Sequence, residues 1–377
     1  MSLDVITHSE VRRLAQSLQK DMGLQLRSRP VWKGPERFAP GIRVGGDSPY
    51  RMLPAFSPNY FLESVCHNGE IYAGTQINGS VGASVYTSAD LKTWVLRSSA
   101  SNVSSISNIG RTILLWWNNR QTVSISNDNG LTWPTALNGT TLINVVAAGA
   151  YGFGLNSSQY YYLFTVTGGC ETLPLPESRQ WKYMLFNGSR YLVLDYYCDR
   201  AYASQDGRTS WQATANLSQA LTDLPGNYGS ITARQAYVID GRFVILDVAR
   251  GSISTVISDD GINWRAGTTG MIFGHHGYIA QCSDKASIYD GALYIGARLT
   301  NGVAGDLGRF VLLEIREGTR VRLMPSFYTP SSSGSSETPP GIHAKVGGTG
   351  LFFNSSANVP GARYEINPDA METYHAL

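Results

Sequence analysis

The sequence is poor in charged side chains. Asp, Glu, Lys and Arg make up 15% of its 377 residues, against roughly 25% in an average soluble protein, which disfavours a helix-rich enzyme coated with Lys and Glu. The 30 basic and 28 acidic residues nearly cancel, and no long run of Lys or Arg occurs. Clustered basic residues are the footprint of nucleic-acid-binding proteins, so we expect no nucleic-acid partner.

Cysteines and long apolar runs are also scarce. The four cysteines stand far apart without paired spacing, which argues against a zinc knuckle or a disulfide-dense module and predicts buried free thiols. No stretch approaches the roughly 18 consecutive apolar residues of a membrane-spanning helix, and residues 1–20 contain six basic, acidic or His side chains instead of a signal-peptide core. We therefore expect no membrane insertion, no secretory export, and no metal or other cofactor.

An amphipathic helix is predicted near the N-terminus. Thr7 followed by Glu10 has the form of a capping box, and Gly23 stands where helices commonly end. The apolar positions recur every three or four residues and therefore share one stripe of the helix. They are Val11, Leu14, Leu18 and Met22. We assign residues 1–23 to an anchoring helix and residues 24–53, which are studded with Pro and Gly, to an extended connector.

The body, residues 54–377, repeats one kind of unit. In each unit a run rich in Tyr, Val, Ile, Leu and Phe follows a tight turn, most often Asn-Gly or Asp-Gly, whose positive φ angles suit a two-residue hairpin. Six runs of this kind are Glu70–Gly74, Arg111–Trp116, Tyr191–Leu194, Phe243–Leu246, Leu293–Gly296 and Leu351–Phe353. A weaker seventh, Tyr160–Phe164, has no glycine at its turn but falls in the gap between its neighbours.

The period of these units predicts the architecture. From Gly69 to Gly350 the spacing averages about 47 residues per unit, close to the roughly 40–50 residues of a four-stranded propeller blade. A helical solenoid would need long 3.6-residue patterns, and the body has none apart from a short turn near Leu217–Leu224. We predict an all-β fold, a β-propeller of seven blades, or of six if Tyr160–Phe164 is an insertion.

A second motif recurs in four units, after the hairpin run. Each copy has a serine, an aspartate two residues later and a tryptophan four or five residues after that aspartate. The aspartate can accept hydrogen bonds from the N–H groups that follow it, and the indole can fold back under the turn. The residues are Ser88, Asp90 and Trp94; Ser126, Asp128, Gly130 and Trp133; Ser204, Asp206 and Trp211; and Ser258, Asp260, Gly261 and Trp264.

The four copies resemble the Asp-box repeats of sialidase-like β-propellers, whose pattern is Ser-x-Asp-x-Gly-x-Thr-Trp. The copy Ser126–Trp133 matches every position, the copies ending at Trp94 and Trp264 are one residue shorter, and the copy ending at Trp211 has a displaced glycine. In that family the box is structural and lies away from the active face. The resemblance therefore implies a fold and says little about chemistry.

Sialidases of that family clamp a carboxylate with three arginines and use a Tyr–Glu nucleophile pair and an Asp acid/base. The nearest segment to their first arginine motif is Tyr50–Pro54, where one extra residue follows Arg51 before the proline. A one-residue slip in a strand turns a side chain to the opposite face. Candidates for the other two arginines are Arg250 and Arg298, and Glu314 with one of the tyrosines is the candidate for the nucleophile pair. We expect no catalytic residues and no enzyme, with a sialidase-like glycoside hydrolase as the alternative.

The layout of a helix, a connector and a β-rich body resembles virion structural proteins of tailed bacteriophages. That resemblance implies a non-enzymatic protein of the tail or capsid, present in several copies, joined to other virion proteins through its helix and connector, and assembled in the host cytoplasm. Loops rich in Tyr, Ser and Gly, such as Ser326–Ser336, are typical of binding surfaces and predict contact with a glycan or protein of the host surface. A propeller adaptor in a cellular complex is a further alternative.

Overall fold

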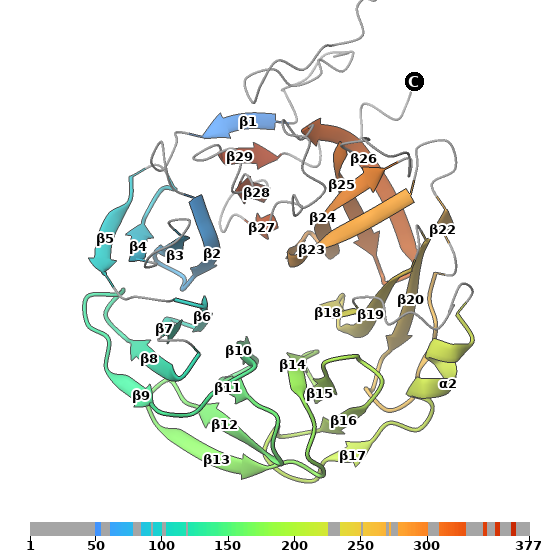
Figure 1. Ribbon diagram of the computed structural model, residues 1–377, viewed down its shortest axis with the longest axis horizontal. Coiled ribbons are helices and arrows are strands. Elements are labelled where there is room, and N and C mark those ends of the chain that lie inside the picture. The colour runs from blue at the N-terminus through green and yellow to red at the C-terminus, as the bar shows by residue number, and fades with distance from the viewer. Residues whose placement is uncertain are drawn as a thin grey trace, which may run out of the picture.

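The chain folds into a ring of small antiparallel sheets. The computed structural model describes residues 50–366, apart from 54–60, 78–83, 92, 100–102, 118–119, 225–233, 250–251, 269–270, 273–277, 301–308, 329–341, 345–350 and 355–362. The described strands form seven sheets, and Figure 1 shows them arranged as blades around a central axis. The all-β propeller expected from the sequence is confirmed.

Blades 1 to 3 follow one another in the chain, and each runs from an inner to an outer strand. Blade 1 is β2 (Phe61–His67), β3 (Tyr72–Ile77), β4 (Ser84–Ser88) and β5 (Val95–Ser98). Blade 2 is β6 (Ser105–Ile109), β7 (Thr112–Trp117), β8 (Thr122–Ser126) and β9 (Thr135–Leu137). Blade 3 is β10 (Asn144–Ala148), β11 (Tyr151–Leu155), β12 (Tyr160–Phe164) and β13 (Cys170–Pro174).

Blades 4 to 6 repeat the same order. Blade 4 is β14 (Trp181–Phe186), β15 (Tyr191–Asp195), β16 (Ala201–Ser204) and β17 (Gln212–Ala213). Blade 5 is β18 (Gln235–Ile239), β19 (Arg242–Ala249), β20 (Ser252–Ser258) and β21 (Arg265–Ala266), with β22 (Met271–Ile272) also paired to β20. Blade 6 is β23 (Tyr278–Tyr289), β24 (Ala292–Thr300), β25 (Arg309–Arg316) and β26 (Arg320–Tyr328).

Blade 7 joins the two ends of the described chain. Its strands β27 (Ile342–Ala344), β28 (Leu351–Asn354) and β29 (Arg363–Ile366) come last in the sequence, whereas its outermost strand, β1 (Tyr50–Leu53), comes first. Strand β1 pairs antiparallel with β29, from Tyr50 opposite Ile366 to Leu53 opposite Arg363. Pairing of this kind covers an open sheet edge and closes the ring.

This closure corrects the boundary drawn from the sequence. The connector was expected to span residues 24–53, yet its last four residues form β1 and belong to the ring. The pairing that makes them a strand lies about 310 residues away in the sequence, so the local Pro and Gly content concealed it. The predicted helix over residues 1–23, with Val11, Leu14, Leu18 and Met22, and the rest of the connector lie outside the described residues.

The weak repeat unit is also corrected. Tyr160–Phe164 was aligned with the strands that follow a hairpin turn, but it is β12, the third strand of blade 3. The hairpin strand of that blade is β11, and Ala148 pairs with Tyr151 across a turn of Gly149 and Ala150. Gly149 has a φ of +57°, so it supplies the left-handed conformation that Asn-Gly or Asp-Gly supplies elsewhere.

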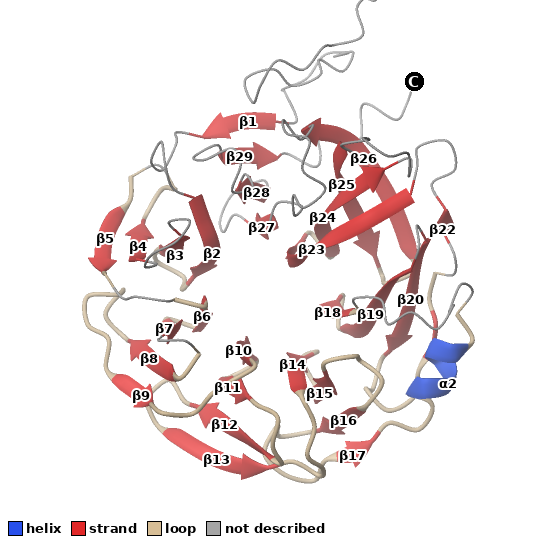
Figure 2. Ribbon diagram, viewed as in Figure 1, coloured by secondary structure: helices blue, strands red, loops and turns tan. Residues whose placement is uncertain are grey.

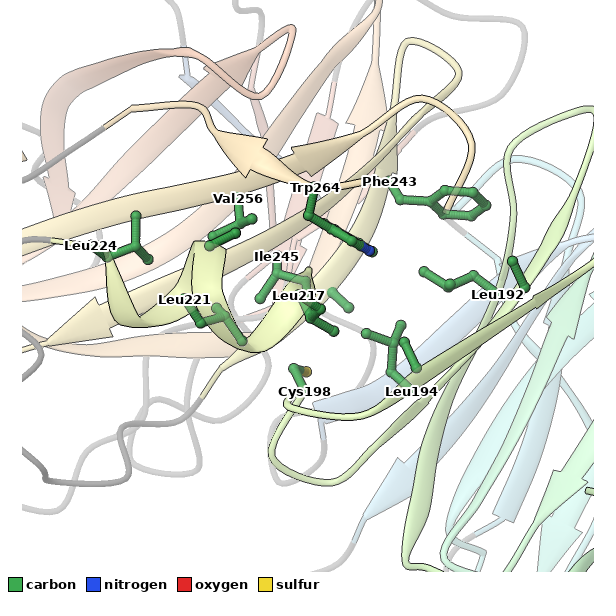
Figure 3. Packing of buried hydrophobic residues seen from close by; sticks show 14 residues of the cluster. Leu192, Leu194, Cys198, Leu217, Leu221, Leu224, Phe243, Ile245, Val256 and Trp264 are labelled. Carbon is green, nitrogen blue, oxygen red and sulfur yellow. The ribbon is translucent and has the colours of Figure 1, made fainter. Parts of the chain in front are cut away.

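The core lies between blades. Strands β8 and β15 are buried at all five positions, as expected for a sheet covered on both faces. Between blades 4 and 5, Leu192 and Leu194 meet Phe243 and Ile245, as Figure 3 shows. The short helix α2 (Leu217–Thr222), expected as a turn, closes the rim of this cluster and is drawn blue in Figure 2.

Two further expectations concern thiols and membranes. The irregular spacing of the cysteines predicted buried free thiols. Cys66, Cys170, Cys198 and Cys282 are all free, which confirms the first part, but Cys198 is buried whereas the other three are half-buried. Helices in the described part of the chain fall short of the length and apolar character that a bilayer crossing demands.

Candidate functional site

The ring has two faces of different construction. Within each of blades 1 to 6, the hairpins between the first and second strands and between the third and fourth strands leave from the same end of the sheet; we call this the turn face. The remaining connections emerge on the opposite side, which we call the loop face. Hydrogen bonds between neighbouring connections, described next, support both assignments.

The four Ser–Asp turns predicted from the sequence occupy equivalent places on the turn face. Each lies between the third and fourth strands of its blade, and its serine hydroxyl donates a hydrogen bond of 2.7 to 3.1 Å to the aspartate Oδ1. The same oxygen accepts a backbone N–H near the end of the turn, from Thr93, Thr132, Thr209 or Asn263. In three turns the serine Oγ also accepts the glycine N–H of Gly130, Gly207 or Gly261.

These bonds stabilise the ionised aspartates. The hydroxyl and the backbone N–H of Thr132 are the main causes that lower the pKa of Asp128 to about 2. Burial would raise the pKa of Asp260, but donors of Asn263 and Ile262 outweigh it and lower that pKa to about 2. In the first turn Leu91 adopts a φ of +61° in place of glycine, a conformation that costs a side chain free energy.

The turn face also locks neighbouring blades together. The Asn68 amide, in the hairpin of blade 1, donates to Asn129 Oδ1 over 2.7 Å in the Ser–Asp turn of blade 2. Asn187 repeats this contact by donating to the Asp259 carbonyl over 2.9 Å, which joins blades 4 and 5. Tyr161 of blade 3 donates its hydroxyl to the Gly207 carbonyl over 2.5 Å. Hydrogen bonds on this face therefore add to the apolar contacts between neighbouring blades.

The residues weighed for a sialidase site do not form one arrangement. Arg51 lies in β1, at the outer edge of blade 7, and Arg298 lies in the second strand of blade 6; Arg250 falls outside the described residues. Glu314 does face a tyrosine, because the Tyr294 hydroxyl donates to its Oε1 over 3.2 Å. Both are buried, and Arg316 Nε donates to the same oxygen over 2.6 Å.

The loop face carries a cluster of three carboxylates around one arginine. Arg179, in the loop before β14, lies 3.0 Å from Glu177, 3.2 Å from Asp195 and 3.5 Å from Asp199. Asp195 ends β15 and is only 2% exposed. Burial is the main cause that raises its pKa to about 6, and a hydrogen bond with the Asp199 side chain adds to the shift.

Asp195 also shapes the loop that follows it, residues 196–200. Its Oδ1 accepts the backbone N–H groups of Asp199 and Arg200, over 3.0 and 3.2 Å. Its own N–H donates to the Arg200 carbonyl, and the Tyr196 N–H donates to the Gln180 carbonyl over 2.7 Å. Within the loop, Cys198 is buried and has a φ of +55°. The loop is thus held at both ends and from beneath.

This loop presents two tyrosines to solvent. Tyr196 and Tyr197 are 45% and 42% exposed, and their rings meet edge to face with centroids 5.3 Å apart. The Lys182 ammonium lies 4.7 Å from the Tyr196 ring centroid and 5.0 Å from that of Tyr183. Lys182 has no ion-pair partner in the described part of the chain. We call Lys182, Tyr183, Tyr196 and Tyr197 the tyrosine patch.

Blade 5 supports the patch from the side. Arg234 Nε lies 3.1 Å from Asp247 Oδ2, and its Nη1 donates to the Tyr197 carbonyl over 3.4 Å. The Tyr183 hydroxyl donates to the Arg234 carbonyl over 3.0 Å. Two ion pairs from adjacent blades therefore fix the backbone beneath exposed aromatic rings. Such rings give large contact area at low cost in conformational entropy.

Sequence patterns did not predict this patch. The strand Tyr191–Leu194 was identified, but Asp195-Tyr196-Tyr197 at its exit was not singled out, although exposed aromatics at a strand end are a usable signal. The partners Arg179, Lys182 and Arg234 come from separate connections. Among the described residues, no group of His, Cys, Asp and Glu could hold a metal ion.

The fold defines the class of this protein as a β-propeller. No protein-family model matches its sequence, and neither does any curated protein. Similar solved structures include YCF48 bound to a D1 peptide, which is 13% identical with a TM-score of 0.51 over 85% of this chain and 97% of that one.

Two further propellers show the same likeness. The β-propeller domain of the Trilobed protease from Pyrococcus furiosus is 11% identical, with a TM-score of 0.51 over 82% of this chain and 95% of that one. The WD40 propeller domain of Doa1 is 10% identical, with a TM-score of 0.50 over 84% of this chain and 96% of that one. At such identities the likeness concerns the fold alone.

Proposed function

We propose that this chain is a non-enzymatic binding propeller, whose tyrosine patch on the loop face contacts a partner. The observation that carries the proposal is the pair of exposed rings, Tyr196 and Tyr197, on a backbone held by two ion pairs. A preformed aromatic surface loses little conformational freedom on binding. Tyrosine is also enriched among the residues that dominate binding energy at interfaces.

The site chemistry favours binding over catalysis. The arginines next to the patch, Arg179 and Arg234, each pair with carboxylates of the same face. Their positive charges therefore stabilise the loops beneath the patch. The Tyr294–Glu314 pair is buried and capped by Arg316, which leaves its carboxylate no approach for a sugar ring. A glycosidase needs two carboxyl groups that reach the scissile bond from either side.

The biological setting that we propose is the virion of a tailed phage. Support comes from the sequence, which predicts an amphipathic stripe of Val11, Leu14, Leu18 and Met22. This stripe would join several copies of the chain to other virion proteins, with the ring facing outward. The loop face would then meet a glycan or protein of the host surface. In this proposal the protein assembles in the host cytoplasm and resides in the particle.

One experiment separates this proposal from its alternatives. The double variant Leu14→Asp and Leu18→Asp should keep the circular dichroism spectrum of the wild type, yet fail to enter particles when it replaces the wild-type gene in an infected host. Normal incorporation of the double variant would refute the anchor. In parallel, fluorogenic glycosides should give no turnover with wild type or with Arg51→Ala; turnover that Arg51→Ala abolishes would favour the hydrolase.

A further inference from the structure

The loop that carries the tyrosine patch is controlled by a crowded set of carboxyl groups. Asp195 lies beneath it with Asp199 on the loop itself and Glu177 on the preceding connection, and Arg179 is the cation that contacts all three. Other charged or titratable groups around the loop are Arg200 at its end, Lys182 on β14, Arg234 from blade 5, Tyr202 on β16 and the buried Cys198 thiol. Three acids therefore share one close arginine.

Asp195 Oδ2 and Asp199 Oδ1 lie 3.2 and 3.5 Å from the same atom, Arg179 Nη1, and the Asp199 N–H donates to Asp195 Oδ1 over 3.0 Å. The two carboxyl groups are therefore neighbours, and a hydrogen bond with the Asp199 side chain is one cause that raises the pKa of Asp195. Two carboxylates this close repel, whereas one carboxylic acid and one carboxylate form a hydrogen bond. The shared proton would join the strand end to the loop, in addition to the two N–H groups that Asp195 Oδ1 accepts. The arrangement of residues 196–200 is therefore tied to the protonation of this pair.

The geometry points to a proton-controlled clamp, in which protonated Asp195 shares its proton in a hydrogen bond to the Asp199 carboxylate when loop 196–200 holds the tyrosine patch as described, and the loop opens more readily when Asp195 is ionised. This inference rests on the proposed function, because it concerns how the patch is presented to a partner. It makes presentation of Tyr196 and Tyr197 tighter in mild acid and looser at neutral pH.

The pH window follows from linkage. In the closed loop the pKa of Asp195 is raised to about 6, and in an open, solvated loop it would return to about 4. A raised pKa means that the closed form binds the proton more tightly, so closure is favoured at low pH and loses that advantage as pH rises toward 6. Loop opening should increase about tenfold per pH unit between 4 and 6 and level off above.

Amide hydrogen exchange of the full chain tests the clamp without any ligand. We expect the protection of residues 196–200, corrected for intrinsic exchange, to fall by about tenfold or more between pH 4.5 and pH 6.5. Residues 156–159 of blade 3 form the matched reference loop, since Asn156, which does not titrate, holds it by accepting the Ser158 N–H over 3.0 Å. Their protection should not change.

Two variants sharpen the result. Asp199→Asn replaces the competing carboxylate by an amide that can donate to Asp195, so residues 196–200 should stay protected at pH 6.5. Asp223→Asn alters an exposed acid at the end of α2 and should behave as wild type. Protection independent of pH in wild type, an equal fall in residues 156–159, or an unchanged profile in Asp199→Asn would each overturn the clamp. The outcome is independent of whether the patch binds a partner.

Discussion

The two faces of the ring differ in how their polar groups are satisfied. On the turn face each Ser–Asp turn satisfies its own aspartate with hydroxyl and N–H donors a few residues away, and its pKa falls, as for Asp128. On the loop face Asp195 accepts two N–H groups of its own loop but also pairs with Arg179 from another connection, and burial raises its pKa. Because each Ser–Asp turn supplies its own hydrogen-bond donors, the turn can recur from blade to blade. The loop-face cluster needs partners from separate connections, so its surface is specific to blades 4 and 5.

The comparison predicts that the turn face carries stability and the loop face carries binding. Variants of the turn face should lower the free energy of unfolding at all pH values where its aspartates are ionised. Variants of the loop face should change the free energy of unfolding in a pH-dependent manner or change the affinity for a partner. The predictions below run from the largest expected effect to the smallest.

Trp264→Ala should be the most destabilising change. The indole is buried in the cluster between blades 4 and 5, against Phe243 and Leu192, and removing a large buried side chain leaves a cavity. We expect a loss of about 3–5 kcal/mol in the free energy of unfolding, measured by urea denaturation with circular dichroism. A loss below about 1 kcal/mol would mean that the turn-face tryptophans do not anchor the blades.

Arg179→Met should destabilise the protein in a pH-dependent manner. Without the guanidinium, ionised Asp195 would be buried beside Asp199 and Glu177 with no close cation, which we expect to cost about 2–3 kcal/mol at pH 7.5. Because protonation of Asp195 removes the buried charge, most of the loss should be recovered at pH 5. Denaturation curves at the two pH values provide the check, and an equal loss at both would contradict the role of Asp195.

Asp128→Ala should cost about 1–2 kcal/mol at neutral pH, because it removes an acceptor for Thr132 and Ser126. The pKa of Asp128 is lowered to about 2, so its contribution is complete above its ordinary pKa and disappears as pH falls toward 2. The stability difference between wild type and variant should therefore shrink between pH 4 and pH 2. A difference that grows in that range would reverse the assigned sign.

Asn68→Ala and Asn187→Ala should differ although the two residues occupy equivalent hairpins. Asn68 is buried and bonds across to Asn129 and Arg111, whereas Asn187 is half-buried and bonds across to Asp259. We expect about 1–2 kcal/mol for Asn68→Ala and about 0.5–1 kcal/mol for Asn187→Ala, by thermal unfolding. The reverse order would show that burial does not determine how much these hydrogen bonds between blades contribute to stability.

Local patterns predicted the parts of the fold that are locally determined. Turns containing glycine, four of them Asn-Gly or Asp-Gly, identified the second strand of six blades, and the Ser–Asp motif marked four turns. The hairpin of blade 3 was missed because Gly149-Ala150 has its glycine at the first turn position with no Asn or Asp beside it, whereas the identified turns end in glycine. Strand β1 was missed because its partner β29 lies at the other end of the chain. Only the second of these strands depends on a partner that is distant in the sequence.

The tyrosine patch could not be predicted for a related reason. Arg179 and Asp195, or Arg234 and Tyr197, lie 16 and 37 residues apart in sequence and belong to connections with no shared motif. Only the fold brings their connections together. The single local hint was the exposed Tyr196-Tyr197 pair after a strand that was itself identified.

Binding of the intact chain tests the account most directly. The double variant Tyr196→Ser and Tyr197→Ser and the turn-face control Leu131→Ser, which alters a side chain 62% exposed, should both keep the wild-type unfolding temperature. On a panel of bacterial envelope preparations and immobilised glycans, the account predicts that the tyrosine variant loses at least tenfold in affinity and that Leu131→Ser loses nothing. Undiminished binding by the tyrosine variant, or loss with Leu131→Ser alone, would contradict it.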